Sequence, residues 1–509
     1  MRKPVTRRRF IGSGVAASVG ARIAPAALSG LAAEYDRYDG LGLADLVAKK
    51  QVTPSELLGA VRARVEALNP KLNAFCQLFF DRAEAQIKQG LPNGPFRGLP
   101  FVLKDIGQQL AGTPTTSGSR LFKDNAPDFD STLVARYKQA GLVIFAKTTT
   151  PEMGLAPSTE SALFGPTRNP WNLERTPGGS SGGAAAAVAS RIVPMAHGSD
   201  GGGSIRIPAS CCGVFGLKPT RGRVPFGPTQ FEGWNGLSAH HALTISVRDS
   251  AALLDASAGA ELGAPYWAPP PQRAFLKEVG ADPDKLRIAL LLRPPGDLPL
   301  DPECKRGAME AAKLCASLGH RVEEAQPSID YAALSGAWVA VTRVSLARVL
   351  EDRARALGRP LTEKDLEPVT WAVYQMGLRV SSVDYSRAIA ICHQAGLAMA
   401  KFHQMHDLIL SPALAKPPVA LGLLSLSRTD VEAVLKEFGA FSPYTAVFNM
   451  TGQPSMSVPL HWSPDGLPIG VMFSARFGEE ATLFRLGAQL EKAKPWASRR
   501  PGVGARQAA

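Results

Sequence analysis

Four short segments without polar residues restrict the fold of this chain more than any other feature of its sequence. They span residues 99–103, 142–146, 192–196 and 469–473. A strand with one face in water alternates polar and apolar residues, whereas a strand covered on both faces is apolar throughout. The segments therefore predict a buried, mixed but mostly parallel β-sheet with helices on both faces.

Helical patterns around these segments favour α/β layering. Thr53 and Glu56 form a capping box for a helix that begins at Pro54 and runs to about Leu68, and Pro70 is expected to end it. Further helices are predicted over residues 132–140, 182–190 and 479–493.

Residues 270–440 differ from the parts on either side. Proline-rich stretches alternate there with long helical patterns at 302–318 and 382–406. Because sheet-forming segments lie on both sides of this region, residues 34–509 are predicted to form one domain with a mostly helical elaboration.

The first 33 residues predict an export signal. Arg7 and Arg8 precede a weakly apolar segment rich in glycine and alanine, which ends in Leu-Ala-Ala at 31–33. This order is similar to that of a twin-arginine signal peptide. A disordered basic tail is the alternative, but it would rarely combine these features. We expect a periplasmic or secreted protein that uses the twin-arginine export machinery.

No later segment offers ~20 apolar residues free of charge, so stable membrane insertion is not expected.

The net charge of +13 does not indicate nucleic-acid binding, because six of the positive charges stand before residue 34. The other charges are interspersed with acidic residues apart from a short C-terminal tail, whereas a phosphate backbone requires a basic stripe.

The six cysteines include no CxxC pair and no histidine spacing typical of zinc sites. No metal and no cofactor are predicted. Proteins exported by the twin-arginine route fold before they meet oxidising conditions, so buried thiols are favoured over disulfides.

The chemistry is concentrated in two glycine-rich clusters. Residues 178–183 are GGSSGG, and residues 200–206 are DGGGSIR. Closely spaced glycines allow backbone amides to approach a ligand. A row of N–H groups that ends at a hydroxyl is what an oxyanion hole beside a nucleophile requires.

Three other interpretations of these clusters fit less well. Apolar residues between the clusters argue against a flexible linker. Neither of the two glycine-rich phosphate-binding motifs fits. Residues 178–182 match GxSxG, but asparagines and prolines at 169–177 argue against the strand that must precede a nucleophile elbow.

Together with GLPFVLKD at 98–105 and GVFGLKPT at 213–220, the two clusters resemble the amidase signature family over nearly all of the mature chain. The resemblance implies a serine hydrolase with the α/β fold of that family, which acts on a small-molecule amide without a cofactor. Segments at 300–304, 358–363 and 448–454 are similar to the 6-aminohexanoate-cyclic-dimer hydrolase-like amidases, which suggests a subfamily and not a substrate.

The resemblance implies a catalytic role for three residues. By position, Ser204 is the nucleophile, Lys104 is the base, and Ser180 relays the proton between them. The resemblance also implies that the peptide bond between Gly179 and Ser180 is cis. The implied oxyanion hole consists of Gly201, Gly202 and Gly203. Many relatives have a larger apolar residue at the first of these positions, and the sequence does not explain the difference.

The residues also support a lysine base independently. A serine hydroxyl is a weak nucleophile without a base, and a lysine is a base only where burial or nearby positive charge disfavours its ammonium form. Lys104 ends an apolar segment, as a buried lysine should. Asp200 and Arg206 flank the nucleophile segment and are expected to support it structurally.

The predicted function is that of an exported amidase, which converts a carboxylic amide through an acyl-enzyme into a carboxylate and an amine or ammonia. One alternative is a subunit of a tRNA-dependent amidotransferase, although such subunits work in the cytosol. A catalytically inactive binding protein is the other, although all three catalytic side chains are present. The sequence is compatible with a homodimer and does not fix the oligomeric state or the substrate.

Overall fold

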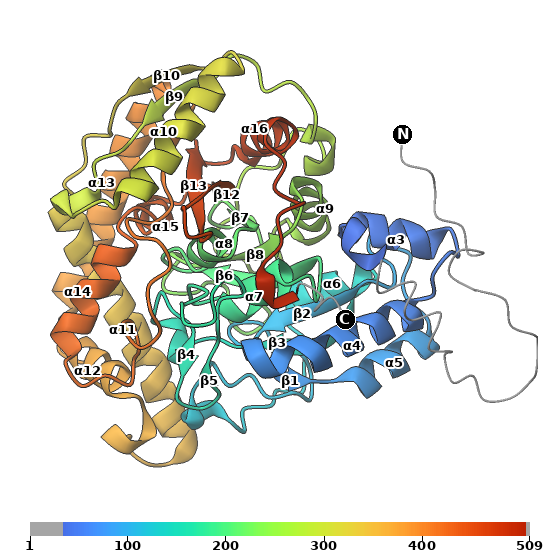
Figure 1. Ribbon diagram of the computed structural model, residues 1–509. Coiled ribbons are helices and arrows are strands. Elements are labelled where there is room, and N and C mark those ends of the chain that lie inside the picture. The colour runs from blue at the N-terminus through green and yellow to red at the C-terminus, as the bar shows by residue number, and fades with distance from the viewer. Residues whose placement is uncertain (1–33, 505–509) are drawn as a thin grey trace, which may run out of the picture.

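The computed structural model describes residues 34–504, whose centre is an eight-stranded sheet in the order β10-β9-β11-β13-β12-β7-β8-β6 (Figure 1). Residues 1–33, with the predicted signal peptide, and residues 505–509 lie outside this range. The strands are β6 (Met195–Asp200), β7 (Phe215–Lys218), β8 (Ala239–Thr244), β9 (Arg287–Leu290), β10 (Arg321–Glu324), β11 (Leu408–Pro412), β12 (Ser455–Trp462) and β13 (Pro468–Ala475).

The sheet is mixed, as expected, but the expectation that most of its strands run parallel is wrong. Of the seven neighbouring pairs in this eight-stranded sheet, β10/β9 and β9/β11 are parallel and the other five are antiparallel. All eight residues of β13 are buried. A strand covered on both faces is apolar whatever the direction of its neighbours, so apolarity did not reveal direction.

A second sheet positions the lysine. It consists of β1 (Phe75–Leu78), β3 (Val143–Thr148) and β2 (Pro100–Lys104), in that order, with β2 parallel to β3. Strand β2 packs beside β6 of the large sheet. The carboxyl end of β2 is thereby brought to the glycine-rich cluster that follows β6. A two-stranded ladder joins β4 (Glu160–Ser161) and β5 (Gly165–Pro166).

The first long helix, α4 (Pro54–Leu72), begins with the predicted capping box: Glu56 N–H donates to Thr53 Oγ1 at 3.2 Å, and Thr53 N–H donates to Glu56 Oε2 at 2.7 Å. Pro70 does not end the helix, contrary to expectation. At position 70 a proline removes one helical hydrogen bond, to the carbonyl of the residue four positions earlier, and its ring crowds that carbonyl. That residue, Glu66, is exposed, so water can satisfy its carbonyl.

Helices cover the sheet on both faces. Successive residues of β13 point to opposite sides; a β-carbon on Gly470 would touch Ser210 of α8, while Phe473 belongs to the same apolar cluster as Phe484 of α16. The remaining helices are α3 (Gly40–Ala48), α5 (Phe80–Gln89), α6 (Thr132–Gln139), α7 (Gly182–Ala189), α8 (Arg206–Cys212), α9 (Val247–Ser257), α10 (Pro302–Ser317), α11 (Tyr331–Leu357), α12 (Pro368–Gly377), α13 (Ser382–Met405), α14 (Val431–Phe441), α15 (Val447–Thr451) and α16 (Glu480–Ala493). The expected α/β fold with helices on both faces is thus confirmed.

The region 270–440 contains the long helices α10, α11 and α13, but it also supplies β9, β10 and β11. It is therefore part of the central sheet as well as an elaboration of it. Helices α12 and α13 both pack against α11, at the side of the molecule away from α4 (Figure 1). Among the described residues, α11 is the single helix long and apolar enough to span a membrane by length and composition; it contacts α12 and α13.

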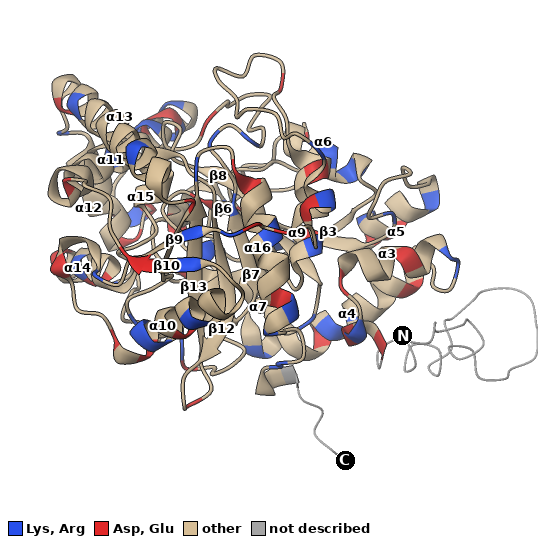
Figure 2. Ribbon diagram, turned by 90° about the horizontal axis from the view of Figure 1, so that it is seen from above, with Lys and Arg blue, Asp and Glu red and all other residues tan. Residues whose placement is uncertain are grey.

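Positive and negative side chains are interspersed along the helices (Figure 2). Many of them pair across one helical turn, as Arg348 does with Asp352 at 2.8 Å.

The six cysteines are free thiols, as expected. Cys76 is half-buried and the other five are buried.

Candidate active site

Lys104 is fully buried at the end of β2. Its Nζ donates to Ser180 Oγ at 2.6 Å and to Ser199 Oγ at 2.9 Å. Burial lowers the pKa of Lys104 to about 7, although the nearby Asp200 carboxylate acts in the opposite direction. A substantial fraction of this amine is therefore neutral near pH 7 and can accept a proton.

Burial alone does not single out this lysine. Burial also lowers the pKa of Lys147 to about 8 and that of Lys218 to about 7. Lys147 donates to Thr115 Oγ1 at 2.7 Å, and Lys218 donates to the carbonyl of Pro219 at 2.8 Å. Lys104 differs from both because its partners are two serine hydroxyls.

Ser180 follows a cis peptide bond with Gly179, as the sequence resemblance implies. The side chain is buried, and its Oγ lies beside Gly154. Ser204 is half-buried and stands two residues before α8, and its carbonyl accepts from the N–H of Ser181 at 3.2 Å. The two glycine-rich clusters, which are separate in sequence, thus meet beside Lys104.

The carboxylate of Asp200 shapes the nucleophile loop. It accepts from the N–H of Gly203 at 2.8 Å and from the N–H of Ile205 at 3.1 Å. One of the three glycine N–H groups expected in the oxyanion hole is therefore already bonded. Within the described residues, the N–H groups of Gly202 and Ser204 have no hydrogen-bond partner, and both residues are half-buried.

Asp200 is held by a buried ion pair. Arg206 donates from Nε and Nη2 to the two carboxylate oxygens at 3.0 and 2.8 Å, and Asn449 donates to Oδ1 at 2.9 Å. Burial raises the pKa of Asp200, but the Arg206 guanidinium outweighs burial and holds that pKa well below its usual range. The supporting role expected for Asp200 and Arg206 agrees with this geometry.

Sequence reasoning missed several residues of the site. Ser199 is the second partner of Lys104, and the backbone N–H of Lys104 donates to Nδ1 of His197 at 3.1 Å. Since Nδ1 accepts, Nε2 carries the proton and faces Nδ1 of His240 at 3.1 Å. Burial lowers the pKa of both histidines, that of His240 to about 3. These rings are therefore neutral supports at pH 7.

A family model for amidases matches residues 56–484. The chain belongs to the amidase signature family. It is 40% identical over 480 residues to the 6-aminohexanoate-cyclic-dimer hydrolase of Paenarthrobacter ureafaciens, with 91% of this chain and 96% of that protein covered. The chain is accordingly a hydrolase of carbon–nitrogen bonds, which acts on amide bonds other than peptide bonds.

Two solved structures support this membership. The structure of 6-aminohexanoate cyclic dimer hydrolase complexed with substrate matches this amidase with a TM-score of 0.85 and 36% identity, over 92% of this chain and 99% of the other. A bacterial aryl acylamidase of the amidase signature family matches with a TM-score of 0.83 and 27% identity, over 92% and 99% of the two chains.

Two tryptophans cover the nucleophile loop of this amidase. A β-carbon on Gly201 would lie 2.8 Å from the Trp234 ring, and one on Gly202 would lie 2.6 Å from the Trp338 ring. The two indoles meet edge to face, with centroids 5.7 Å apart. The absence of a side chain at Gly201, which the sequence left unexplained, thus makes room for Trp234.

Ser204 opens onto a large cavity of about 630 Å³. Most of its lining is apolar and comes from α11, α14, α15 and the segment 154–157. A cavity of this size can enclose a small organic molecule with its scissile group beside the nucleophile. The size and polarity of the cavity suit an amide with extended hydrocarbon parts.

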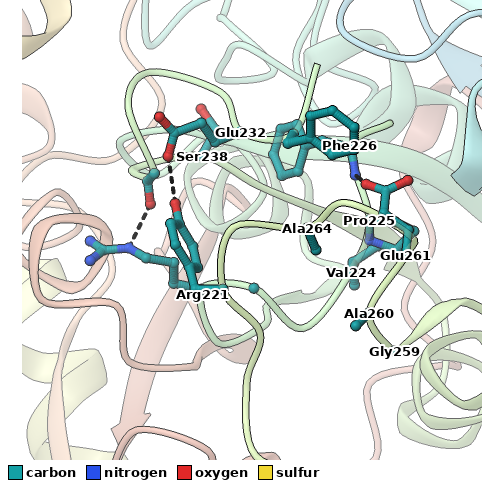
Figure 3. Close-up of a pocket in the computed structure, with 14 residues that line it drawn as sticks. Arg221, Val224, Pro225, Phe226, Glu232, Ser238, Gly259, Ala260, Glu261 and Ala264 are labelled. Carbon is teal, nitrogen blue, oxygen red and sulfur yellow. Dashed lines mark hydrogen bonds between the residues drawn. The ribbon is translucent and has the colours of Figure 1, made fainter. Parts of the chain in front are cut away.

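A second, much smaller cavity of about 20 Å³ lies near Arg221 and Glu261 (Figure 3). Its polar groups are bonded within the chain: the Tyr266 hydroxyl donates to Glu232 at 2.6 Å, and Arg221 Nε donates to the Gly236 carbonyl at 2.6 Å. A space of this size has room for about one water molecule. Across residues 34–504, no cluster of three or more His, Cys, Asp or Glu side chains could hold a metal ion.

Proposed function

We propose that this amidase cleaves its substrate through a covalent acyl-enzyme on Ser204, with Lys104 as the base and Ser180 as the proton relay. The observation that carries the proposal is the 2.6 Å hydrogen bond between Lys104 Nζ and Ser180 Oγ. The pKa of Lys104, lowered by burial to about 7, supports it, because a base must be neutral to take a proton.

The first step breaks the C–N bond. Ser204 Oγ attacks the amide carbon, its proton passes to Ser180 Oγ, and the proton of Ser180 passes to Lys104 Nζ. As the tetrahedral intermediate collapses, the relay runs in reverse and protonates the leaving nitrogen. The amine or ammonia departs, and the acyl group stays on Ser204 as an ester.

The second step returns the enzyme to its starting state. A water molecule attacks the ester carbon and gives up one proton through the same relay, which then protonates Ser204 as the carboxylic acid leaves. The released acid loses its remaining proton to the solvent and becomes the carboxylate. In both steps negative charge develops on the carbonyl oxygen. The free N–H groups of Gly202 and Ser204 support their role as oxyanion donors, with Gly201 adjacent, whereas Gly203 N–H is bonded to Asp200.

A fluorophosphonate, which reacts with activated serines, tests this proposal. One equivalent should bind, and peptide mapping should place it on Ser204. Ser204→Ala should abolish labelling, and Ser210→Ala, at another buried serine nearby, should not. Labelling of another residue would contradict the assignment of Ser204 as the nucleophile. No labelling at all would favour the inactive binding protein. Transfer of ammonia to charged tRNA would instead establish the amidotransferase.

The signal predicted from the sequence of residues 1–33 motivates a second proposal, that the protein is exported to the periplasm or the exterior by the twin-arginine machinery. The double variant Arg7→Lys/Arg8→Lys should keep the protein in the cytoplasm, since the receptor for such signals reads the arginine pair. Unchanged recovery outside the cytoplasm would refute this assignment.

A further inference from the structure

Arg343 is the single charged side chain among the residues that line the large cavity. It belongs to α11, and no other charged residue occurs between Tyr331 and Ala347. Ser335 and Val339 precede it by two turns and one turn on the same helix face, and both also line the cavity. Arg343 therefore lies on the face of α11 that lines the cavity.

Arg343 is half-buried, and within residues 34–504 its guanidinium has no hydrogen-bond, ion-pair or aromatic partner. The other arginines of α11 differ. Arg348 pairs with Asp352 at 2.8 Å, and Arg353 donates to the carbonyl of Leu121 at 3.0 Å. Burial lowers the pKa of Arg343, with no acidic group to oppose it.

Arg343 lies at some distance from the reacting atoms, but in the same cavity. Trp338, five residues earlier on α11, covers Gly202 of the nucleophile loop. Five residues of α-helix rise about 7.5 Å, so a ligand that starts at Ser204 must extend along the helix to reach Arg343. Most residues that line the cavity are apolar, although Thr342 and Ser335 on α11 bring hydroxyl groups to it.

We propose that Arg343 is a subsite for a carboxylate at the end of the substrate remote from the scissile amide. The inference rests on the proposed function of Ser204, and it specifies the substrate class: an amide joined by a hydrocarbon spacer to an anionic group. A guanidinium binds a carboxylate through two parallel hydrogen bonds, which are strongest where water is partly excluded. A substrate with an amine at that end would be repelled.

Paired boronic acids provide the test without knowledge of the natural substrate. A boronic acid forms a reversible tetrahedral adduct with a nucleophilic serine, so its affinity follows from how far it slows fluorophosphonate labelling of Ser204. Each pair shares one alkyl chain, of about four to eight carbons to span the helical rise, and differs only in a terminal carboxylate or methyl group.

At one chain length the carboxylate member should bind about 10-fold or more tightly than its neutral partner. Arg343→Gln should remove this preference, and Arg343→Lys should retain part of it because the charge remains. Arg348→Gln, on the same helix but outside the cavity, is the matched control and should keep the full preference. Thermal unfolding of each variant checks that it is folded.

Equal binding of the two members at every length, including no binding of either, would overturn the subsite, and so would a preference that survives Arg343→Gln. Failure of the proposed function has a different signature, because fluorophosphonate would then leave Ser204 unlabelled in the unmodified chain. The two results are therefore distinguishable in one set of measurements.

Discussion

The Trp234 indole occupies the space that a β-carbon on Gly201 would need, with 2.8 Å between that position and the ring. Real carbon atoms do not approach so closely. The glycine and the tryptophan therefore depend on each other, although they belong to different segments of the chain. Trp234 has a positive φ of 48°, so its backbone is also fixed in an uncommon conformation.

Gly201→Ala tests this dependence. The new methyl group should displace Trp234 or the nucleophile loop, and fluorophosphonate labelling of Ser204 should slow by about 10-fold, since small displacements near reacting groups are costly. Trp234→Ala in the same chain should recover part of the rate. Gly336→Ala is the control, because a β-carbon there would meet nothing within 4 Å. Additive losses in the double variant would contradict the contact.

The dependence of the rate on pH tests the lysine base. Because Lys104 must be neutral, and burial lowers its pKa to about 7, turnover should rise as pH increases through 7 and level off at alkaline pH. The histidines near it cannot cause this rise, since burial holds the pKa of His240 at about 3 and that of His197 well below its usual value.

Lys104→Ala should remove most of the activity together with the rise at pH 7. The folded state should survive, because an amine that is costly to bury as a cation is deleted. Rates and thermal unfolding, both measured between pH 5 and pH 9, check the two expectations. If Lys104→Ala kept the wild-type rate and pH profile, Lys104 could not be the base. The same conclusion would follow if a histidine variant lost the increase in turnover through pH 7.

Ser180→Ala and Ser204→Ala should differ in severity. Ser204→Ala removes the atom that forms the acyl-enzyme, so turnover should fall to background. Ser180→Ala removes only the relay between Lys104 and the nucleophile, and we expect a loss of about 100- to 10,000-fold, the usual contribution of positioned proton transfer. Measurable burst-phase acylation in Ser180→Ala, and none in Ser204→Ala, would support Ser204 as the nucleophile and Ser180 as the relay. Acylation in Ser204→Ala and none in Ser180→Ala would instead make Ser180 the nucleophile.

Arg206→Met tests the buried ion pair. It leaves the Asp200 carboxylate buried and unpaired, a change that typically costs about 3–5 kcal/mol in the free energy of unfolding. Arg321→Met is the control, because its partner Glu323 is exposed and such pairs contribute about 0–1 kcal/mol. Urea unfolding at pH 7.5 measures both.

The sign of the pH effect provides a second readout for the same variant. With Arg206 present, the pKa of folded Asp200 lies below its unfolded value, so its contribution to stability is lost as pH falls through the folded pKa. Without Arg206, burial raises that pKa, and stability should instead fall as pH rises. If the free energies of unfolding of the unmodified protein and of Arg206→Met differed by the same amount at pH 5 and at pH 7.5, this explanation would be wrong.

The residues that meet in the candidate site could largely be named from the sequence, because they stand in local motifs. Lys104 stands at the end of an apolar strand, and Ser180 and Ser204 stand in glycine clusters whose spacing is visible in the sequence. Asn449 and Trp338 could not be assigned in the same way. Each reaches the site from a distant segment through tertiary packing, and nothing in the residues around it marks the contact.

The fold was predictable at the level of layers and not of strand direction. Apolar segments show that a strand is buried, but β6 and β13 pair antiparallel to β8 and β12 without any change in composition. Strand β10, with Arg321, Glu323 and Glu324, is polar because it lies at the sheet edge, so its sequence did not indicate a strand.

The hydrogen bond from Asn449 to the backbone carbonyl of Asp200 spans 249 residues at 2.9 Å. It therefore cannot form until the ribosome has added nearly the whole chain. At 5–20 residues per second, roughly 12 to 50 s separate the synthesis of the nucleophile loop from that of its anchor. During that interval Asp200 has its local partners, such as Arg206, but not the Asn449 bonds that tie the nucleophile loop to the C-terminal part of the chain. A chain that ends before residue 449 therefore carries Ser204 in a loop without this anchor.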